Sequence, residues 1–212
     1  MKITRTELGL IFAITVAGFA VRFARLSDVA VEHFDEGVYA SNLWFASEGY
    51  AYPDRHLYAP PLVPSLIEWS MFFSSGRTAP LLPGVILGSL TVPLLWWVTR
   101  RWFGAAAGVA AASLLALNDF HITMSRSALT DVPMVFFLLL SVWMVHESVA
   151  QGHLLVAVLG GLATGVASST KYNGWLSMAI AMSGTAGALL AMRLIQRGSA
   201  GSNGTSSKKI KP

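Results

Sequence analysis

Cysteine is absent from this chain, so the sequence excludes disulfides, zinc–thiolate sites and a thiol nucleophile. Charge is scarce as well, because Asp, Glu, Lys and Arg make up only 12% of the 212 residues. That share is about half of what soluble domains usually carry. Hydrophobic residues make up 54%. These proportions argue against a water-soluble core and favour a protein that crosses a membrane several times.

The net charge of +4 raises the question of a nucleic-acid partner. The basic residues, however, stand at the edges of apolar runs and are not interleaved with aromatic residues in a polar stripe. Basic residues in such positions are explained by the positive-inside rule of membrane proteins. We therefore expect a lipid bilayer as a partner and no nucleic acid.

Apolar segments predict an all-α fold, a polytopic membrane helix bundle of about six transmembrane helices. The segments are 8–26, 79–98, 103–117, 132–145, 154–169 and 175–192. A cleaved signal peptide is an alternative for the first segment, which is short and contains Gly18-Phe19-Ala20. Between the first two spans, 36–48 and 61–74 have the apolar spacing of short helices that lie in the membrane interface. We expect one transmembrane domain over 1–197 and a disordered, basic tail over 198–212.

The distribution of basic residues predicts the orientation. With the N-terminus in the cytoplasm and six alternating spans, the cytoplasmic segments hold nine of the 15 basic residues and two of the 11 acidic ones. Basic-residue bias sets orientation, so both termini are expected in the cytoplasm of a multi-pass cell-membrane protein. The polar segments 27–78, 118–131 and 170–174 then all meet at the outer face.

Glycines one helical turn apart recur in the predicted spans and allow helices to pack closely in lipid. The pairs are Gly84 and Gly88, Gly104 and Gly108, and Gly161 and Gly165. We interpret them as packing positions and not as phosphate-binding loops.

The stretch His33-Phe34-Asp35-Glu36-Gly37-Val38-Tyr39 places two adjacent carboxylates just after the first span. If the donor is a sugar on a polyprenyl phosphate, transfer needs a base for the acceptor, and Asp35 or Glu36 can supply it. The leaving phosphate needs cations, which Arg22, Arg126 and Lys171 can supply. Asp131, His121 and Tyr172 lie in the same outer segments, and we expect them to shape the donor site.

Simpler readings of these residues stay open at this point. The acidic pair could only open the helix that follows it, and Asp131 with Val132-Pro133 is a helix-start signal. Arg126 could be an interface anchor, and Lys171 could extend its side chain to the membrane surface. No pair of His, Asp or Glu has spacing typical of a metal site.

Taken in order, the motifs resemble the GT-C glycosyltransferases of the protein O-mannosyltransferase and aminoarabinose-transferase-like family. The elements are Arg22 at the end of the first span, Phe34-Asp35-Glu36-Gly37-Val38-Tyr39-Ala40, Tyr58-Ala59-Pro60-Pro61-Leu62-Val63-Pro64, Gly76-Arg77, Arg100-Arg101-Trp102-Phe103-Gly104, Ser125-Arg126 with Asp131, Gly161-Leu162-Ala163 and Thr170-Lys171-Tyr172. The resemblance implies an inverting glycosyltransferase with Asp35 as the catalytic base and Glu36 beside it. It implies a polyprenyl-phosphate sugar donor and a protein, lipid or glycan acceptor on the outer face. No cofactor is required by this chemistry, and a divalent metal ion stays open as an addition.

The chain departs from the family pattern in two respects. Many members have histidine before the Pro-Pro pair, where this chain has Ala59. Members are also more than twice as long, so this chain is expected to be an N-terminal half or a truncated enzyme. Two other classes of function remain as alternatives, a transporter or flippase-type protein and a non-catalytic subunit of a glycan-assembly complex.

Overall fold

The computed structural model describes residues 3–40, 60–74 and 76–206, and all regular structure in these ranges is helical. The α-helices are α1 (Arg5–Phe23), α2 (Phe34–Ala40), α4 (Leu62–Met71), α5 (Leu82–Phe103), α6 (Ala105–Leu117), α7 (Asp119–Ser125), α8 (Asp131–Gln151), α9 (Leu154–Thr170) and α10 (Leu176–Ser206). Three 3-10 turns join them, η1 (Leu26–Asp28), η2 (Ala79–Leu81) and η3 (Tyr172–Trp175). The prediction of an all-α chain is confirmed.

Each of the six predicted spans contains a helix, but not all of these helices are long enough to cross a membrane. Four stretches reach membrane length and apolarity: Arg5–Asp28, Ala79–Phe103, Asp131–Gln151 and Tyr172–Ile195. A fifth would be α6 together with α7, which are bent by 60° relative to each other. Helix α9 is apolar but only 17 residues long. The described chain is thus a bundle with four or five membrane-length helices.

Glycine sets the two tight reversals in the bundle. Gly104 (φ 95°) separates α5 from α6, and Gly152 (φ 70°) separates α8 from α9. Both have a positive φ, which glycine adopts without the steric cost that a Cβ would impose. The reversals let α5 pack along α6 and α8 along α9.

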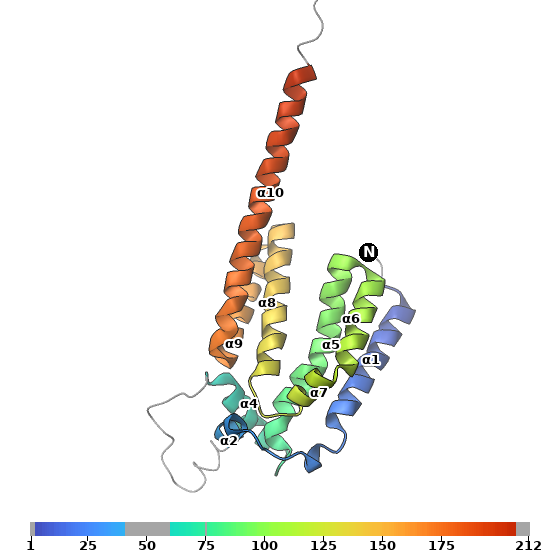
Figure 1. The fold of residues 1–212 in the computed structure, drawn as a ribbon, viewed down its shortest axis with the longest axis vertical. Coiled ribbons are helices and arrows are strands. Elements are labelled where there is room, and N and C mark those ends of the chain that lie inside the picture. Colours follow the sequence, from blue (N-terminus) through green and yellow to red (C-terminus); the bar gives the residue numbers. More distant parts are fainter. Residues whose placement is uncertain (1–2, 41–59, 75, 207–212) are drawn as a thin grey trace, which may run out of the picture.

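Figure 1 shows α2, α4 and α7 gathered at one end of the bundle, while the N-terminus and the reversal between α5 and α6 lie at the opposite end. We call the end that carries α2, α4 and α7 the loop end. The described parts of the first two segments that were predicted to be outer therefore lie at one end of the molecule, and α4 of the first segment contacts α9, which leads into the third.

A small apolar core attaches the first loop to the loop end. Its buried members come from η1, α2, α4, η2, α5 and the segment before α8: Leu26, Tyr39, Val63, Ile67, Leu81, Val85 and Ala128. Helix α4, which lies in the predicted interfacial segment 61–74, contacts α2, α5 and α9. The other predicted interfacial helix, 36–48, is helical up to Ala40 and otherwise lies outside the described residues.

Two arginine–glutamate pairs lie at the opposite end. Arg100 donates to both carboxylate oxygens of Glu7, at 2.5 and 3.2 Å, and Arg101 donates to both oxygens of Glu147, at 2.9 and 3.2 Å. Each pair joins different helices, α1 with α5 and α5 with α8. Bidentate contacts of this kind fix geometry as well as adding energy. The pairs therefore hold together the end of the bundle that is remote from the acidic motif.

The C-terminal helix is longer than the sequence suggested. Helix α10 continues to Ser206, through the first part of the tail that we expected to be disordered. Glycines at 198, 201 and 204 disfavour a helix in that part. Residues 207–212 lie outside the described part of the chain.

Outward-facing side chains of the bundle are largely apolar. Many large hydrophobic side chains are about 70% exposed or more. Examples are Phe12 on α1, Leu154 on α9 and Ile195 on α10. A water-soluble protein rarely exposes so continuous an apolar surface. In a bilayer these side chains meet lipid tails, so the exposed surface agrees with a membrane bundle.

Two of the predicted glycine pairs behave differently in the packing. A Cβ built on Gly84 would come within 2.6 Å of the Ser125 carbonyl oxygen, and one built on Gly88 would come still closer to the Ser125 side chain and within 3.1 Å of Val132. A Cβ built on Gly161 or Gly165 would meet no atom of another element within 4 Å in the described part of the chain. The packing interpretation is correct for the pair in α5 and wrong for the pair in α9, where Gly160 makes the close contact instead.

We expect Gly84→Ala to lower the free energy of unfolding by about 1–3 kcal/mol, because the new methyl group forces α5 away from the backbone at the end of α7. The matched control is Gly161→Ala, which should be neutral or stabilising by up to about 1 kcal/mol, since alanine is the better helix former. Thermal unfolding in detergent, followed by circular dichroism, measures both. Equal melting temperatures for the two variants would contradict the close contact at Gly84.

Candidate active site

The acidic motif forms the first turn of α2, and His33 caps it. The first backbone hydrogen bond of the helix runs from Gly37 N–H to the His33 carbonyl oxygen (3.2 Å), and the Asp35 N–H donates to His33 Nδ1 (3.2 Å). Glu36, three residues after the cap, accepts a hydrogen bond from the His33 N–H (3.1 Å). This reciprocal arrangement resembles a capping box, with histidine in the place of the usual Ser or Thr and with the Asp35 N–H, not that of Glu36, donating to the cap.

The carboxylate of Glu36 accepts hydrogen bonds from three backbone N–H groups. Its Oε2 accepts from the N–H groups of Glu32 (3.3 Å) and His33, and its Oε1 accepts from the Ala128 N–H (2.7 Å). The residue is only 5% exposed. Glu36 therefore connects the first loop to the segment before α8, since Ala128 lies 92 residues further along the chain.

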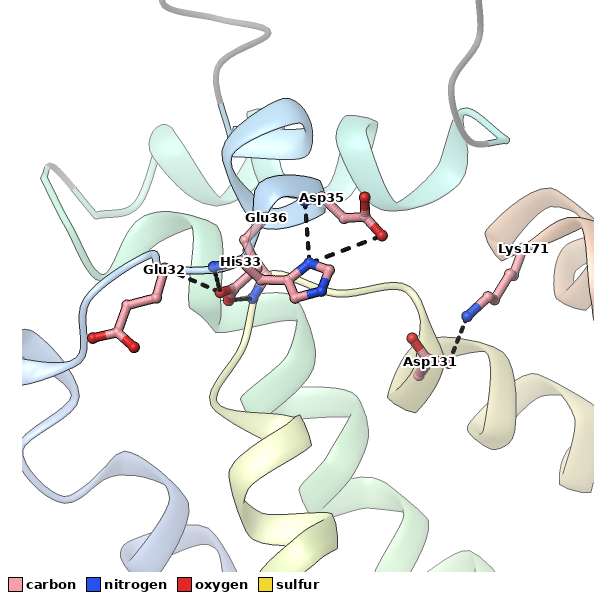
Figure 2. A network of polar contacts seen from close by, with 7 residues as sticks. Glu32, His33, Asp35, Glu36, Asp131 and Lys171 are labelled. Carbon is pink, nitrogen blue, oxygen red and sulfur yellow. Dashed lines mark hydrogen bonds and ion pairs between the residues drawn. The ribbon is translucent and has the colours of Figure 1, made fainter.

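The carboxylate of Asp35 is directed away from that of Glu36 (Figure 2). Its side chain is 32% exposed, and its Oδ2 lies 3.9 Å from His33 Nδ1. A partly exposed carboxylate at a helix N-terminus is favoured by the helix dipole. Of the two acids, Asp35 is therefore the one whose oxygens are accessible to a reacting group.

Arg22 is fully buried between α1, α6 and α7. Each of its five N–H groups has an acceptor within the protein: Gly18 O (2.9 Å), Ala116 O (3.2 Å), Leu115 O (3.2 Å), Ser125 Oγ (3.3 Å) and His121 Nδ1 (2.8 Å). Two of these acceptors are carbonyls in the last turn of α6, which lack partners within their own helix. Arg22 thus completes the end of α6 at the bend into α7.

His121 receives one of these hydrogen bonds. Since arginine can only donate, His121 Nδ1 must be the acceptor, and the neutral ring then carries its proton on Nε2. Ser125 Oγ donates to the His121 carbonyl oxygen (2.5 Å), which closes the network along α7. In the described part of the chain His121 is therefore a member of the α1–α6–α7 junction.

Arg126 links the same junction to the first loop. Its Nη2 donates to the Ala24 carbonyl oxygen (2.9 Å) at the end of α1. The side chain lines a groove of about 460 Å³ together with Glu32 and Asp119. One guanidinium nitrogen of Arg126 is therefore hydrogen-bonded to the backbone at the end of α1, and the side chain borders the groove at the loop end.

Asp131 and Lys171 form an ion pair that joins the start of α8 to the end of α9. Lys171 Nζ lies 2.6 Å from Asp131 Oδ1, and the two side chains are 35% and 46% exposed. The pair appears in the same close view as the acidic motif, on the side toward which the Asp35 carboxylate is directed (Figure 2). Tyr172 begins η3 directly after Lys171 and is 61% exposed.

The predicted residues therefore fall into two groups at the loop end. Asp35, Asp131, Lys171 and Tyr172 are partly or well exposed, and Arg126 borders a groove. The other group is Arg22, Glu36 and His121. Arg22 and Glu36 have their polar atoms hydrogen-bonded within the protein, whereas His121 bonds to Arg22 through Nδ1 and its buried Nε2 has no partner among the described residues.

His33 and Ser125 stand within the sequence motifs but were assigned no role, and Ala128 was not identified. The spacing of His33 and Glu36 matches a capping box apart from the residue type at the cap, so that signal was available. The backbone N–H of Ala128 carries no sequence signal, and Ser125 is identified only once α1 and α7 are packed together. Within the described residues, no group of three or more His, Asp or Glu lies close enough to hold a metal ion.

The fold and the exposed polar residues at one end of an apolar bundle define a membrane protein with a candidate site at its surface. Residues 82–207, from α5 through α10, match the dolichyl-phosphate-mannose-protein mannosyltransferase family. Since the match covers more than half of the chain, the chain belongs to this family of membrane glycosyltransferases. The acidic motif around Asp35 lies before the matched residues.

Two curated proteins of Bacillus subtilis (strain 168) are similar to the chain. "Putative mannosyltransferase YkcB" is 25% identical over 142 residues, which cover 66% of this chain and 19% of that protein. "Putative mannosyltransferase YycA" is 25% identical over 177 residues, which cover 81% of this chain and 26% of that protein. The chain thus spans about a fifth to a quarter of the length of these relatives.

Proposed function

We propose that this chain carries the base and the phosphate-binding cations of a glycosyltransferase that uses a polyprenyl-phosphate sugar. Asp35 removes the proton from the acceptor hydroxyl as its oxygen attacks the anomeric carbon. The bond from that carbon to the phosphate oxygen breaks, and the polyprenyl phosphate leaves with the electron pair. A single displacement of this kind inverts the anomeric configuration. The acceptor is a hydroxyl-bearing protein, lipid or glycan.

The observation that supports this proposal is the shared contact of α4 with α2 and α9. Helix α2 carries Asp35, and α9 ends beside Lys171. Because α4 contacts both helices, the base and the cation lie at the same end of the bundle, although 136 positions separate them in the sequence. A general base and a leaving-group cation must flank one reacting centre.

Arg126 and Lys171 are the cations of the proposal. Both are accessible, and guanidinium and ammonium groups bind phosphate through charge-assisted hydrogen bonds. Arg22, although expected from the sequence to bind phosphate, would have to give up protein acceptors to do so. We therefore assign it to the α1–α6–α7 junction, and Glu36 to the attachment of the first loop. Asp131 positions Lys171 through their ion pair, and Tyr172 lies next to Lys171 at the start of η3.

The proposal includes the orientation derived from basic residues. The loop end faces the outside, and both termini are cytoplasmic. The proposal also assigns only part of the active site to this chain, because the chain covers only 19% and 26% of its curated relatives. Contacts to the acceptor and to the sugar would come in part from segments beyond those described here.

Transfer and transport make different predictions for the lipid donor. In membranes that contain the chain, radiolabelled polyprenyl-phosphate mannose should lose its label to the acceptor, which is a protein, a glycan or a second lipid that is separated from the donor. A flippase would instead move the intact donor across liposomes without loss of label. Movement of the donor without cleavage would overturn the proposal. The transporter reading is disfavoured because the charged residues in the described spans lie near the helix ends and not at their centres.

Lys171→Met is expected to raise the KM for polyprenyl-phosphate mannose about 10-fold, since one charge-assisted contact to the phosphate is lost. Arg77→Gln, which removes an exposed cation at the same end, should leave the KM unchanged. The rate of label loss at increasing donor concentration measures both.

A double variant separates phosphate binding from simple pairing with Asp131. If Lys171 only neutralises Asp131, then Lys171→Met combined with Asp131→Asn restores the donor KM. Restoration would count against a phosphate role for Lys171, and a persistently high KM would support it.

A further inference from the structure

The described part of α2 has only seven residues, and a helix of two turns is marginal without capping or packing. Its C-terminal half contributes Tyr39 to the loop-end core, which anchors that half. Its N-terminal turn, where Asp35 lies, needs a different anchor. The structure supplies it through backbone N–H groups held by His33 and Glu36.

The His33 ring contacts Asp35 through Nδ1. Nδ1 accepts the Asp35 backbone N–H at 3.2 Å and lies 3.9 Å from Asp35 Oδ2. The His33 side chain is 61% exposed, so core packing does not explain its position. A ring held by the backbone N–H on one side of the carboxylate restricts the orientations that the carboxylate can take. Figure 2 shows the His33 ring between the Asp35 and Glu36 side chains.

We propose that His33 is a positioning residue for Asp35, which caps α2 through Nδ1 and thereby fixes the direction of the Asp35 carboxylate. This inference rests on the proposed function, because it takes Asp35 as the base. Positioning matters for catalysis because a shift of about 1 Å in a reacting group can cost about 100-fold in rate. His33 takes no proton from the acceptor and touches no substrate in this role.

The chain offers a matched control. His153 is also a histidine at the residue that precedes a helix, α9, but its side chain makes no capping hydrogen bond. His153→Ala therefore removes the same chemical group from the same kind of position without removing a cap. His33→Asn provides the rescue, because asparagine is among the best capping residues and keeps a side-chain acceptor.

For His33→Ala we expect kcat and kcat/KM for label loss from polyprenyl-phosphate mannose to fall together by about 10-fold or more, as when an interaction made only in the transition state is lost. His33→Asn should recover most of the rate, and His153→Ala should equal the wild type. Wild-type kcat in His33→Ala, or an equal loss in His33→Asn, would overturn the capping role.

A second measurement does not depend on turnover. Hydrogen exchange of the Asp35 amide in the full chain in detergent should be about 5-fold faster in His33→Ala, the change that corresponds to a cap of about 1 kcal/mol. Exchange at the wild-type rate would overturn the inference even if no variant were active. If Asp35→Asn keeps full activity, the proposed function fails, while the exchange experiment still decides whether His33 caps α2.

Discussion

Replacing Arg22 with leucine is expected to prevent stable folding of the bundle. The leucine side chain keeps the apolar volume but supplies no donor to the carbonyl oxygens, the hydroxyl and the imidazole that Arg22 now satisfies. Each buried polar atom left without a partner costs about 1–3 kcal/mol. Even if only the Ala116 carbonyl and His121 Nδ1 stayed unsatisfied, the loss would be about 2–6 kcal/mol. That range is comparable with the whole stability of many domains.

The bend between α6 and α7 explains why this site is sensitive. The last carbonyls of α6 have no N–H groups of their own helix to bind, because α7 departs at 60°. Apart from the Asn118 N–H on the Leu115 carbonyl oxygen (3.3 Å), the donors to the Leu115 and Ala116 carbonyls in the described residues come from Arg22. A cation at the C-terminal end of a helix is also favoured by the helix dipole. Arg22 combines both effects, and a lysine in its place would offer three donors in place of five.

Arg25→Leu is the control, because Arg25 is three residues away and its side chain is 85% exposed. Its ion pair with Asp28 (2.7 Å) is a surface pair, and such pairs contribute about 0–1 kcal/mol. Fluorescence-detected gel filtration and thermal unfolding in detergent compare the two variants. An Arg22→Leu protein that elutes and melts like Arg25→Leu would show that the buried network is dispensable.

Sequence patterns predicted the elements of this fold better than the roles of its polar residues. Apolar runs identified the helices of the bundle because lipid imposes length and composition on each segment separately. Their number as spans did not follow as simply. Helix α9 is short and α6 bends into α7, and both features depend on how helices pack at their ends.

The candidate site shows the same division. Asp35 and Glu36 are chemically equivalent neighbours in the sequence, and only their surroundings separate them. Glu36 lies against the Ala128 N–H of a distant loop, whereas Asp35 stays accessible beside His33. Arg22 and Lys171 likewise carry the same charge at the end of a span. Partners that are 93 to 103 residues away decide that Arg22 is buried, and a local sequence pattern does not contain them.

Asp35→Asn is expected to lower kcat for sugar transfer by about 100-fold to 10,000-fold, the usual contribution of a general base. The amide keeps the size of the carboxylate but cannot take the acceptor proton. The fold should be retained, because asparagine is tolerated in the first turn of a helix and the Asp35 backbone N–H can still donate to His33. The donor KM should change little, since the base contacts the acceptor.

Asp28→Asn is the matched control for this variant. Asp28 is a carboxylate of the same loop, at the end of η1, and its side chain is 54% exposed. Its replacement should leave kcat at the wild-type value, because its charge is paired with Arg25 and lies outside the α2 turn. Loss of label from polyprenyl-phosphate mannose measures both variants in the same membranes. An Asp35→Asn protein that keeps more than about a tenth of the wild-type rate would exclude a general base at this position. That result would favour a non-catalytic subunit, because a binding role tolerates the isosteric amide and proton transfer does not.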